Sequence, residues 1–354
     1  MNPPSDREER DQVLAYAFDV ARRSMPTPEL ASVLETALIG LDAQAHRYDR
    51  PFFVDLPLSV YAAVRGERAP GIPIAAAIAL MFLGFDIGDD LTDGDLPPHW
   101  RDRSFADTLI VMVALVASLP QTIIGALDVP SDLRAHMQAA VAARLLTMLG
   151  GQHRDVRAAG TADVSAAAVE ESVAAKTGGE FALFAWLAAA SAGAGAAALD
   201  QFDTMGRAFG TAVQLTSDCR DLFDAPHSKD LAAGTRTLPI VLTLERLAGD
   251  ARAEFVALLE RARTDAAAGI AVRERIRAAR VLPMCAMIID VYRQQALAAI
   301  DASGAPESAR LRLRTIVGFA AWPPRRDAAR GPSGLPARGP EIGDERAAGA
   351  GDDE

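Results

Sequence analysis

The sequence contains little that could crosslink the chain or bind a soft metal. It has two cysteines, Cys219 and Cys285, which lie in segments of different character. Their spacing gives neither a disulfide framework nor a zinc motif, and such sparse cysteine use is typical of a reducing compartment. The five histidines are scattered and form no pair that suggests a metal site or a nucleophilic triad. We therefore expect a cytoplasmic protein in which both cysteines are packing residues.

The chain also lacks targeting signals and an excess of positive charge. Its N-terminus, MNPPSDREERDQ, does not have the basic-then-apolar order of a signal peptide. No uninterrupted run of about 18 apolar residues predicts a transmembrane segment. The acids outnumber the bases by 47 to 36, which gives a net charge of -11. This balance argues against nucleic acid or an anionic membrane surface as the main partner.

Alanine and other helix-forming residues are abundant, while aromatic residues make up only 6% of the chain. Apolar residues recur at helical spacing, and alternating β-branched runs are scarce, so we predict an all-α fold. Helices are expected near residues 11–24, 28–46, 54–65, 71–93, 104–126, 130–151, 163–197, 200–224, 236–248, 251–264, 269–300 and 305–320.

No linker divides these segments, so we expect a single domain over residues 11–321. Residues 1–10 are predicted to be a disordered tail. The stretch 322–354 is rich in Pro, Gly and charge and has no hydrophobic period, so it is predicted to be a second disordered tail.

An acidic stripe follows one of the most apolar runs in the chain. The stretch FDIGDDLTDGD comes directly after AAAIALMFLG, and the helical period places Asp86, Asp89, Asp90 and Asp93 on one face. Like charges at this spacing repel by about 0.2 to 0.5 kcal/mol per pair, and the helix C-terminus disfavours anions further. A divalent cation such as Mg²⁺, bound by carboxylates, water and substrate phosphate, would offset this repulsion. The alternative is a solvated helix end that runs into a polar loop.

A second acidic stripe lies further along the chain. In GTAVQLTSDCRDLFD, the side chains of Gln214, Asp218 and Asp221 share a helical face, and Asp224 follows them. By itself this segment could be the end of a surface helix. Together, the two stripes predict two metal-binding rims that face each other.

At this point the sequence resembles the trans-isoprenyl diphosphate synthase (polyprenyl synthetase) family and the class I terpene synthases that share its fold. Asp89-Asp90-Leu91-Thr92-Asp93 matches the family's DDxxD motif in full. The other matches, in family order over roughly residues 40–240, are Gly151-Gln152 with Asp155, Lys176-Thr177-Gly178, Gln214 with Ser217-Asp218-Cys219-Arg220-Asp221, and Asp230-Leu231 with Gly234-Thr235-Arg236-Thr237-Leu238-Pro239.

The resemblance implies a bundle of long helices around a deep apolar cavity, the isoprenoid synthase type I fold. It implies a cluster of about three Mg²⁺ ions that holds the diphosphate of a small-molecule prenyl substrate, and it allows a homodimer. The implied catalytic residues are Asp89, Asp90, Asp93, Lys176, Asp218 and Asp221. The implied metal ligands are Asp89, Asp90, Asp93, Ser217, Asp218 and Asp221. The implied substrate-binding residues are Arg50, Phe85, Arg101, Arg103, Gln152, Thr177, Gln214 and Arg236.

Within this resemblance, Phe85 would form the floor of the cavity and limit substrates to about 15 to 20 carbons. Phe85 could equally be an ordinary core residue. Phe181, Phe184 and Trp186 could stabilise a carbocation through their aromatic faces, although rings at helical spacing more often serve packing.

The chain departs from the family where a second substrate, isopentenyl diphosphate, would bind. Arg50-Pro51 can match the upstream Arg-Pro, but the preceding Gly-Gly-Lys is absent. Downstream, Pro97-Pro98-His99-Trp100 stands where an arginine pair is expected, and Arg101 and Arg103 follow slightly late. In the second half, Ser217 replaces an aspartate of the second motif and Thr235 replaces a lysine.

The half that binds the allylic diphosphate is thus largely retained, and the acceptor half is mostly lost. We therefore expect Mg²⁺-dependent ionisation of one allylic diphosphate, followed by cyclisation or elimination, as in a terpene synthase (diphosphate lyase). One alternative is a prenyl diphosphate synthase or other prenyltransferase in which Arg47, Arg50, Arg101 and Arg103 rebuild the acceptor site. Another is a non-catalytic subunit of a heteromeric prenyl synthase.

Overall fold

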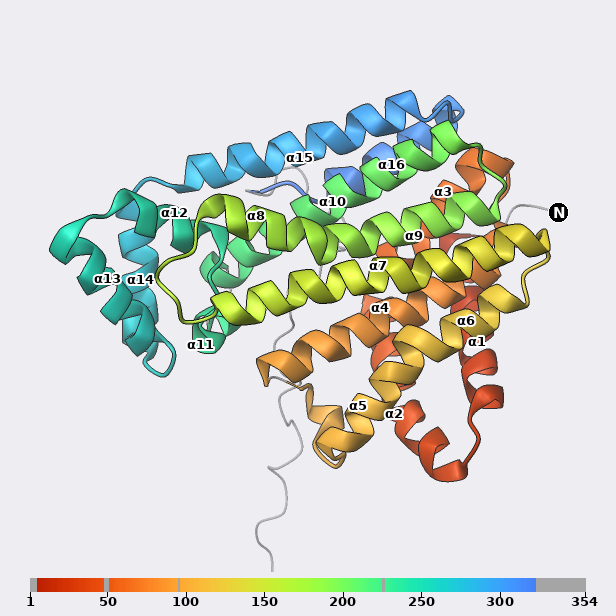
Figure 1. Cartoon of the computed structure of the whole chain (residues 1–354), viewed down its shortest axis with the longest axis horizontal. Helices are drawn as coiled ribbons and strands as arrows, with labels where there is room; N and C mark the ends of the chain where they lie inside the picture. Colours follow the sequence, from red (N-terminus) through yellow and green to blue (C-terminus); the bar gives the residue numbers. More distant parts are fainter. Residues whose placement is uncertain (1–4, 48–50, 95, 225–226, 323–354) are drawn as a thin grey trace, which may run out of the picture.

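The computed structural model describes residues 5–47, 51–94, 96–224 and 227–322 (Figure 1). Every regular element in these ranges is helical. The α-helices are α1 (Asp6–Ser24), α2 (Pro28–Arg47), α3 (Phe52–Arg65), α4 (Ile72–Asp93), α5 (Phe105–Val113), α6 (Leu119–Gly125), α7 (Ser131–Ala158), α8 (Ala166–Ala175), α9 (Thr177–Ser191), α10 (Ala196–Phe223), α11 (Lys229–Ala233), α12 (Leu238–Arg246), α13 (Gly249–Ala262), α14 (Ala266–Ala278), α15 (Leu282–Ala302) and α16 (Glu307–Gly318). Short 3-10 turns, η1 (Ala69–Gly71) and η2 (Pro98–Trp100), flank α4, and a π-helical turn, η3 (Ala114–Ser118), joins α5 to α6.

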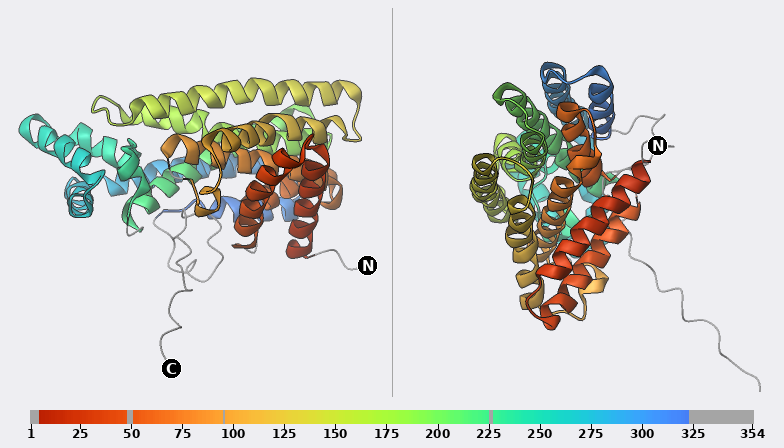
Figure 2. Two further views of the ribbon diagram at one scale, coloured as in Figure 1. Left: turned by 90° about the horizontal axis from the view of Figure 1, so that it is seen from below. Right: turned by 90° about the vertical axis from the view of Figure 1, so that its right-hand side faces the viewer.

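Helices α7, α9, α10 and α15 run side by side along the long axis of the molecule (Figure 1). Helices α13 and α14 form one end, and α1 and α2 pack together near the other end (Figure 2). Helices α4 and α9 are central, because their apolar residues are buried on every side. The predicted all-α bundle of long helices is confirmed.

Three of the predicted helices are interrupted. The segment expected as one helix over 163–197 is broken at Lys176, which has φ -76 and ψ -89 and separates α8 from α9. The segment 104–126 contains the π-helical turn, and 269–300 is divided between α14 and α15. In each case the apolar period continues across the break, so periodicity alone could not reveal it.

The predicted tails also need revision at the N-terminus. Helix α1 begins at Asp6, not at residue 11, because Ser5 and Glu8 form a reciprocal capping box. Glu9 and Arg10 are then buried against the bundle. The predicted C-terminal tail, apart from Trp322, lies outside the described residues.

Glycines allow α9 and α10 to approach each other closely. A Cβ on Gly210 would lie 2.5 Å from the carbonyl oxygen of Thr177, and a Cβ on Gly178 would lie 2.7 Å from Oγ1 of Thr211. Larger residues would separate the two helices. Glycine is unfavourable inside a helix, and at Gly178 this cost is offset by the close packing of α9 on α10 beside Lys176.

Two helical stretches are long and apolar enough to cross a membrane by length and composition. Ala69–Asp93 is 72% buried in the bundle, and Phe105–Gly125 is 39% buried. The first is the central core helix of the fold, and core helices of soluble proteins pass the same test. The length and composition of these two helices are therefore weak evidence that the chain crosses a membrane.

A buried ion network joins α1, α3 and α16. The carboxylate of Asp55, which is 4% exposed, accepts hydrogen bonds from Arg68 at 2.8 Å and from Arg312 at 2.6 and 3.1 Å. Arg68 also donates to Glu9, and Arg312 pairs with Asp6. The carboxylate of Asp55 thus balances the positive charges of two arginines from distant parts of the chain.

Replacing Asp55 by Ala should lower the free energy of unfolding by about 3 kcal/mol, because it leaves two partly buried guanidinium groups without their shared partner. Urea denaturation followed by circular dichroism measures this change. Asp19→Ala is the control, since its exposed pair with Arg23 on α1 should contribute less than about 1 kcal/mol. Equal losses in the two variants would contradict a special role for Asp55.

Candidate functional site

The first acidic stripe lies at the C-terminal end of α4. The helix stops at Gly94, which adopts the left-handed conformation with φ 71 and donates its N–H to the carbonyl of Asp90. Asp90 is 7% exposed, Asp89 is half-buried and Asp93 is exposed. The three carboxylates of the motif therefore range from the buried interior to solvent at the end of a buried helix.

Lys176 supplies a positive charge to this helix end. The break between α8 and α9 sets the position of this residue, and Nζ lies 3.0 Å from Oδ1 of Asp89 and 3.7 Å from Oδ2 of Asp155. Burial by itself lowers the pKa of Lys176, but Asp89 and Asp155 outweigh this effect and raise it above the ordinary value. Lys176 therefore stays protonated and connects the first motif to α7.

Gln152 and Asp155 on α7 complete this side of the site. Nε2 of Gln152 donates to Oγ1 of Thr92 at 2.9 Å, while its Oε1 is buried with no hydrogen-bond partner among the described residues. Burial raises the pKa of Asp155, and the nearby carboxylates of Asp89 and Asp93 raise it further, against the opposing effect of Lys176. The negative charge here exceeds what the one lysine neutralises.

The second acidic stripe is held by a chain of hydrogen bonds between α9 and α10. Oγ1 of Thr177 donates to Oε1 of Gln214 at 2.9 Å, and Nε2 of Gln214 donates to Oδ1 of Asp218 at 2.8 Å. Burial raises the pKa of Asp218 to about 7, although the bond from Gln214 opposes the shift. Asp155 and Lys176 both act on this pKa, so Asp218 lies within electrostatic reach of the Lys176 ion pairs.

Asp221 is bound to a neighbouring helix. Its carboxylate accepts hydrogen bonds from the Ser228 hydroxyl and from the backbone N–H groups of Lys229 and Asp230, at 3.1 and 3.2 Å for the two amides. These donors are the first residues of α11, so Asp221 caps that helix. Ser217 lies half-buried on the same helix as Asp221.

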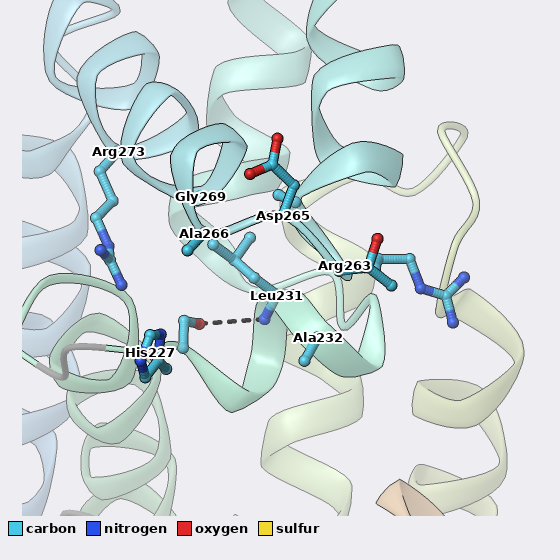
Figure 3. A pocket seen from close by; sticks show the side chains of 11 residues that line it. His227, Leu231, Ala232, Arg263, Asp265, Ala266, Gly269 and Arg273 are labelled. Carbon is cyan, nitrogen blue, oxygen red and sulfur yellow. Dashed lines mark hydrogen bonds between the residues drawn. The ribbon is translucent and has the colours of Figure 1, made fainter.

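A pocket of about 260 Å³ lies beyond α11, against α14 (Figure 3). His227 and Arg273 line one side of it, and Arg263 and Asp265 lie toward the other (Figure 3). The Nε of Arg273 donates to the carbonyl of Leu222 at 2.6 Å, and Asp265 caps α14. The polar groups of this pocket thus serve the structure around it.

The residues of the two stripes fit a hard divalent cation. Their donors are carboxylate, hydroxyl and amide oxygens, which Mg²⁺ prefers, and Mg²⁺ takes few protein ligands because water and phosphate complete its shell. In the described part of the chain, no group of three or more His, Cys, Asp or Glu side chains is already placed to hold a metal ion. Burial disfavours the charged forms of Asp155 and Asp218, and a cation bound beside them would favour those forms.

Of the predicted arginines, Arg101 and Arg103 are among the described residues, and the hydrogen bonds of Arg103 are directed away from the first motif. The guanidinium group of Arg103 donates to Oγ1 of Thr36 and to the carbonyl of Ser32 on α2, at 3.1 and 2.8 Å. Arg101 is exposed, and Arg50 lies outside the described residues.

Arg236 is not brought to the aspartates either. It is 4% exposed and bonds to the carbonyls of Thr161 and Gly234 and to Glu260. Burial lowers its pKa, although the pair with Glu260 opposes the shift. Its predicted contact with the substrate has no support in this arrangement.

Phe85 lies one helical turn before Asp89 and packs against α9. Its ring stacks on that of Phe184, with centroids 6.3 Å apart. Phe184 and Phe181 are buried, and Phe181 continues the aromatic packing to Phe52 on α3, with ring centroids 5.0 Å apart. Trp186 instead contacts His136 and Arg144 of α7.

Sequence reasoning missed two side chains near the first motif. Nε2 of Gln44 on α2 donates to Oδ2 of Asp86 at 2.8 Å. Glu180 lies one turn after Lys176 on α9, close enough for the charges of Asp89 and Asp86 to act on it. Glu180 had a detectable signal, since an acid directly after KTGG and before an apolar run breaks the pattern of a buried helix.

Comparison with known proteins gives a single family. The polyprenyl synthetase family model matches residues 109–274, which include Gln152, Lys176 and the second stripe. No curated protein matches the chain.

Solved structures of synthases from several organisms share the fold. The chain is similar to a polyprenyl synthetase from Streptomyces coelicolor, at 20% identity and a TM-score of 0.73 over 89% of this chain and 98% of that one. It is similar to a geranylgeranyl pyrophosphate synthetase from Pyrococcus horikoshii, at 18% identity and a TM-score of 0.77 over 90% and 97%. A geranylgeranyl pyrophosphate synthase from Corynebacterium glutamicum, complexed with isoprenyl diphosphate and magnesium, has 17% identity and a TM-score of 0.73 over 90% and 98%.

These findings confirm the predicted resemblance to the trans-isoprenyl diphosphate synthase family. They favour a prenyltransferase, the first alternative of the sequence analysis, over the expected terpene synthase. The assignment of each site residue stays a prediction.

Replacing Asp221 by Ala should destabilise the metal-free protein by about 1 to 3 kcal/mol, because three donors of α11 lose their acceptor. It should also speed hydrogen exchange of the α11 amides. Chemical denaturation and hydrogen-exchange mass spectrometry measure the two effects. Asp224→Ala, an exposed acid at the end of α10, is the matched control. A metal-free Asp221→Ala protein as stable as the parent would point instead to a dedicated metal ligand.

Proposed function

We propose that this chain, a member of the trans-isoprenyl diphosphate synthase family, is a prenyltransferase that ionises an allylic prenyl diphosphate and joins it to an acceptor such as isopentenyl diphosphate. The observation that carries the proposal is the pair of contacts by which Lys176 joins Asp89 of the first motif to Asp155 on α7, 3.0 and 3.7 Å away, at the end of α4. The family match and the shared fold support it.

The residues of the site would bind the diphosphate and exclude water from the reaction. Mg²⁺ bound by Asp89, Asp90, Asp93 and Asp218, with Ser217 as a weak ligand, would neutralise the diphosphate as it leaves. The ammonium group of Lys176, already 3.0 Å from Asp89, would contact a diphosphate oxygen. Thr177 and Gln214 hold Asp218 in place, and Gln152, whose Oε1 has no partner among the described residues, can orient a bound group.

The reaction follows from this placement of charge. The C–O bond of the allylic diphosphate breaks, and its electron pair leaves with the diphosphate. The double bond of the acceptor would then attack the allylic cation, and the new cation would lose a proton to the released diphosphate, which gives a longer prenyl diphosphate. The buried aromatic side chains of α3, α4 and α9 offer unreactive surfaces to the cation.

A terpene synthase is the second candidate, and the contacts of Arg103 favour it. Arg103, one of the arginines predicted to rebuild the acceptor site, is bound to α2, so it is not free to receive a second diphosphate. Without an acceptor, the allylic cation would cyclise, eliminate or react with water.

The homodimer and the cytoplasmic location stay predictions.

Purified protein with Mg²⁺, an allylic diphosphate of about 15 carbons and isopentenyl diphosphate should give a longer prenyl diphosphate, measured by liquid chromatography and mass spectrometry. Chelation of Mg²⁺ or the substitution Asp90→Ala should abolish the reaction, because the leaving diphosphate loses its counter-charge. Asp19→Ala, far from the site, should leave it unchanged.

The same assay separates the alternatives. Release of diphosphate with a hydrocarbon or alcohol from the allylic substrate alone would establish the terpene synthase. An inert protein that gains no activity from any allylic substrate would support the non-catalytic subunit.

Replacing Phe85 by Ala should lengthen the product by at least one isoprene unit, because it removes the ring one turn inside the first motif that stacks on Phe184. Mass spectrometry of the products measures the change. Phe105→Ala on α5, where the ring is 65% exposed, is the control and should leave product length unaltered. An unchanged product range in Phe85→Ala would identify Phe85 as a packing residue only.

A further inference from the structure

Glu180 is an acidic side chain in the site that the proposed reaction does not yet use. It lies one helical turn after Lys176, and its N–H donates to the carbonyl of Lys176 at 3.0 Å. Among the described residues, no hydrogen bond or ion pair reaches its carboxyl group. Lys176, the nearest positive charge that acts on it, already pairs with Asp89 and Asp155.

The position of Glu180 follows from two contacts between α4 and α9. At the end of α4, Nζ of Lys176 lies 3.0 Å from Asp89. Deeper in the bundle, the ring of Phe184 stacks on that of Phe85. Glu180 is one turn from Lys176 and one turn from Phe184 on α9, so it lies between the ion pair and the ring stack. A diphosphate at the ion pair would place the first carbons of its prenyl chain beside this carboxyl group.

The surroundings of Glu180 disfavour a negative charge in the absence of substrate. Burial raises its pKa well above the ordinary value, and Asp89 and Asp86 raise it further, while Lys176 has the opposite effect. A carboxyl group kept here without a partner destabilises the fold. Ionisable groups whose charged form is destabilised by their surroundings are typical of functional sites.

We propose that Glu180 is a further catalytic residue whose carboxyl oxygen contacts the allylic carbons and stabilises the positive charge that develops on them. This inference rests on the proposed function. As the C–O bond breaks, its electron pair leaves with the diphosphate and one positive charge spreads over the allylic carbons. No bond to Glu180 forms and no proton moves, so its contribution is electrostatic and is strongest when bound substrate shields this half-buried carboxyl from water.

The first test compares Glu180→Gln, which keeps the shape, with Glu180→Leu, which removes the polar group. Both should lower kcat for diphosphate release, by about 100-fold in the Leu variant, with a much smaller change in KM for the allylic diphosphate. Metal-free Glu180→Gln should have a higher Tm than the parent, because an unpartnered carboxyl is removed. Glu171→Gln, an exposed acid on α8, is the control for both measurements.

A lowered Tm together with matched losses in kcat and in substrate binding would identify Glu180 as a structural residue and overturn the proposal. Unchanged kcat in both variants would overturn it as well.

The second test needs no turnover. Isothermal titration calorimetry compares a prenyl amine, whose ammonium group stands for the allylic cation, with the matching prenyl alcohol, both in the presence of inorganic diphosphate and Mg²⁺. The parent protein should prefer the amine by about tenfold, and Glu180→Gln should lose this preference. A preference retained in Glu180→Gln would overturn the role of Glu180 even if the parent is active. Suppose instead that the parent releases no diphosphate but prefers the amine, and that Glu180→Gln loses this preference. That result would support the electrostatic role of Glu180 and reject the proposed function.

Discussion

The ion pair between Lys176 and Asp89 is the interaction on which the candidate site depends. It joins the end of α4 to the break between α8 and α9, and through Asp155 it extends to α7. Three carboxylates of the first motif lie at the C-terminal end of a helix, where both their mutual repulsion and the helix dipole disfavour them. One half-buried lysine, Lys176, relieves part of this repulsion. The remainder is a negative potential that suits a divalent cation and its diphosphate.

The packing of α9 on α10 is the constraint that aligns the second motif with the first. Gly178 and Gly210 let the two backbones approach, and this brings Thr177 within hydrogen-bond distance of Gln214. Gln214 in turn orients Asp218, whose pKa responds to the same lysine. Asp221, in contrast, is directed toward α11. The second motif therefore divides its acids between the site and the support of a neighbouring helix.

The balance between prenyl transfer and terpene formation depends on the acceptor side. The match to the polyprenyl synthetase model and the shared fold favour transfer, whereas Arg103, predicted for the acceptor site, is occupied by α2. Glu180 is relevant to both reactions, because each begins with the same allylic cation. A carboxyl beside that cation would assist ionisation whatever reacts with it afterwards.

By itself, the sequence determined the all-α fold, the resemblance to the trans-isoprenyl diphosphate synthase family and the two acidic stripes, because helical periodicity and the order of the motifs are local properties of the chain. It also indicated Lys176 and Gln214 through their motifs. Only the tertiary structure decided which side chains meet: that Lys176 bridges Asp89 and Asp155, that Asp221 caps α11, and that Arg236 is directed away. It also revealed Glu180 between the ion pair and the stacked rings. These outcomes depend on helix breaks and on contacts between segments far apart in the chain, which apolar periodicity does not encode.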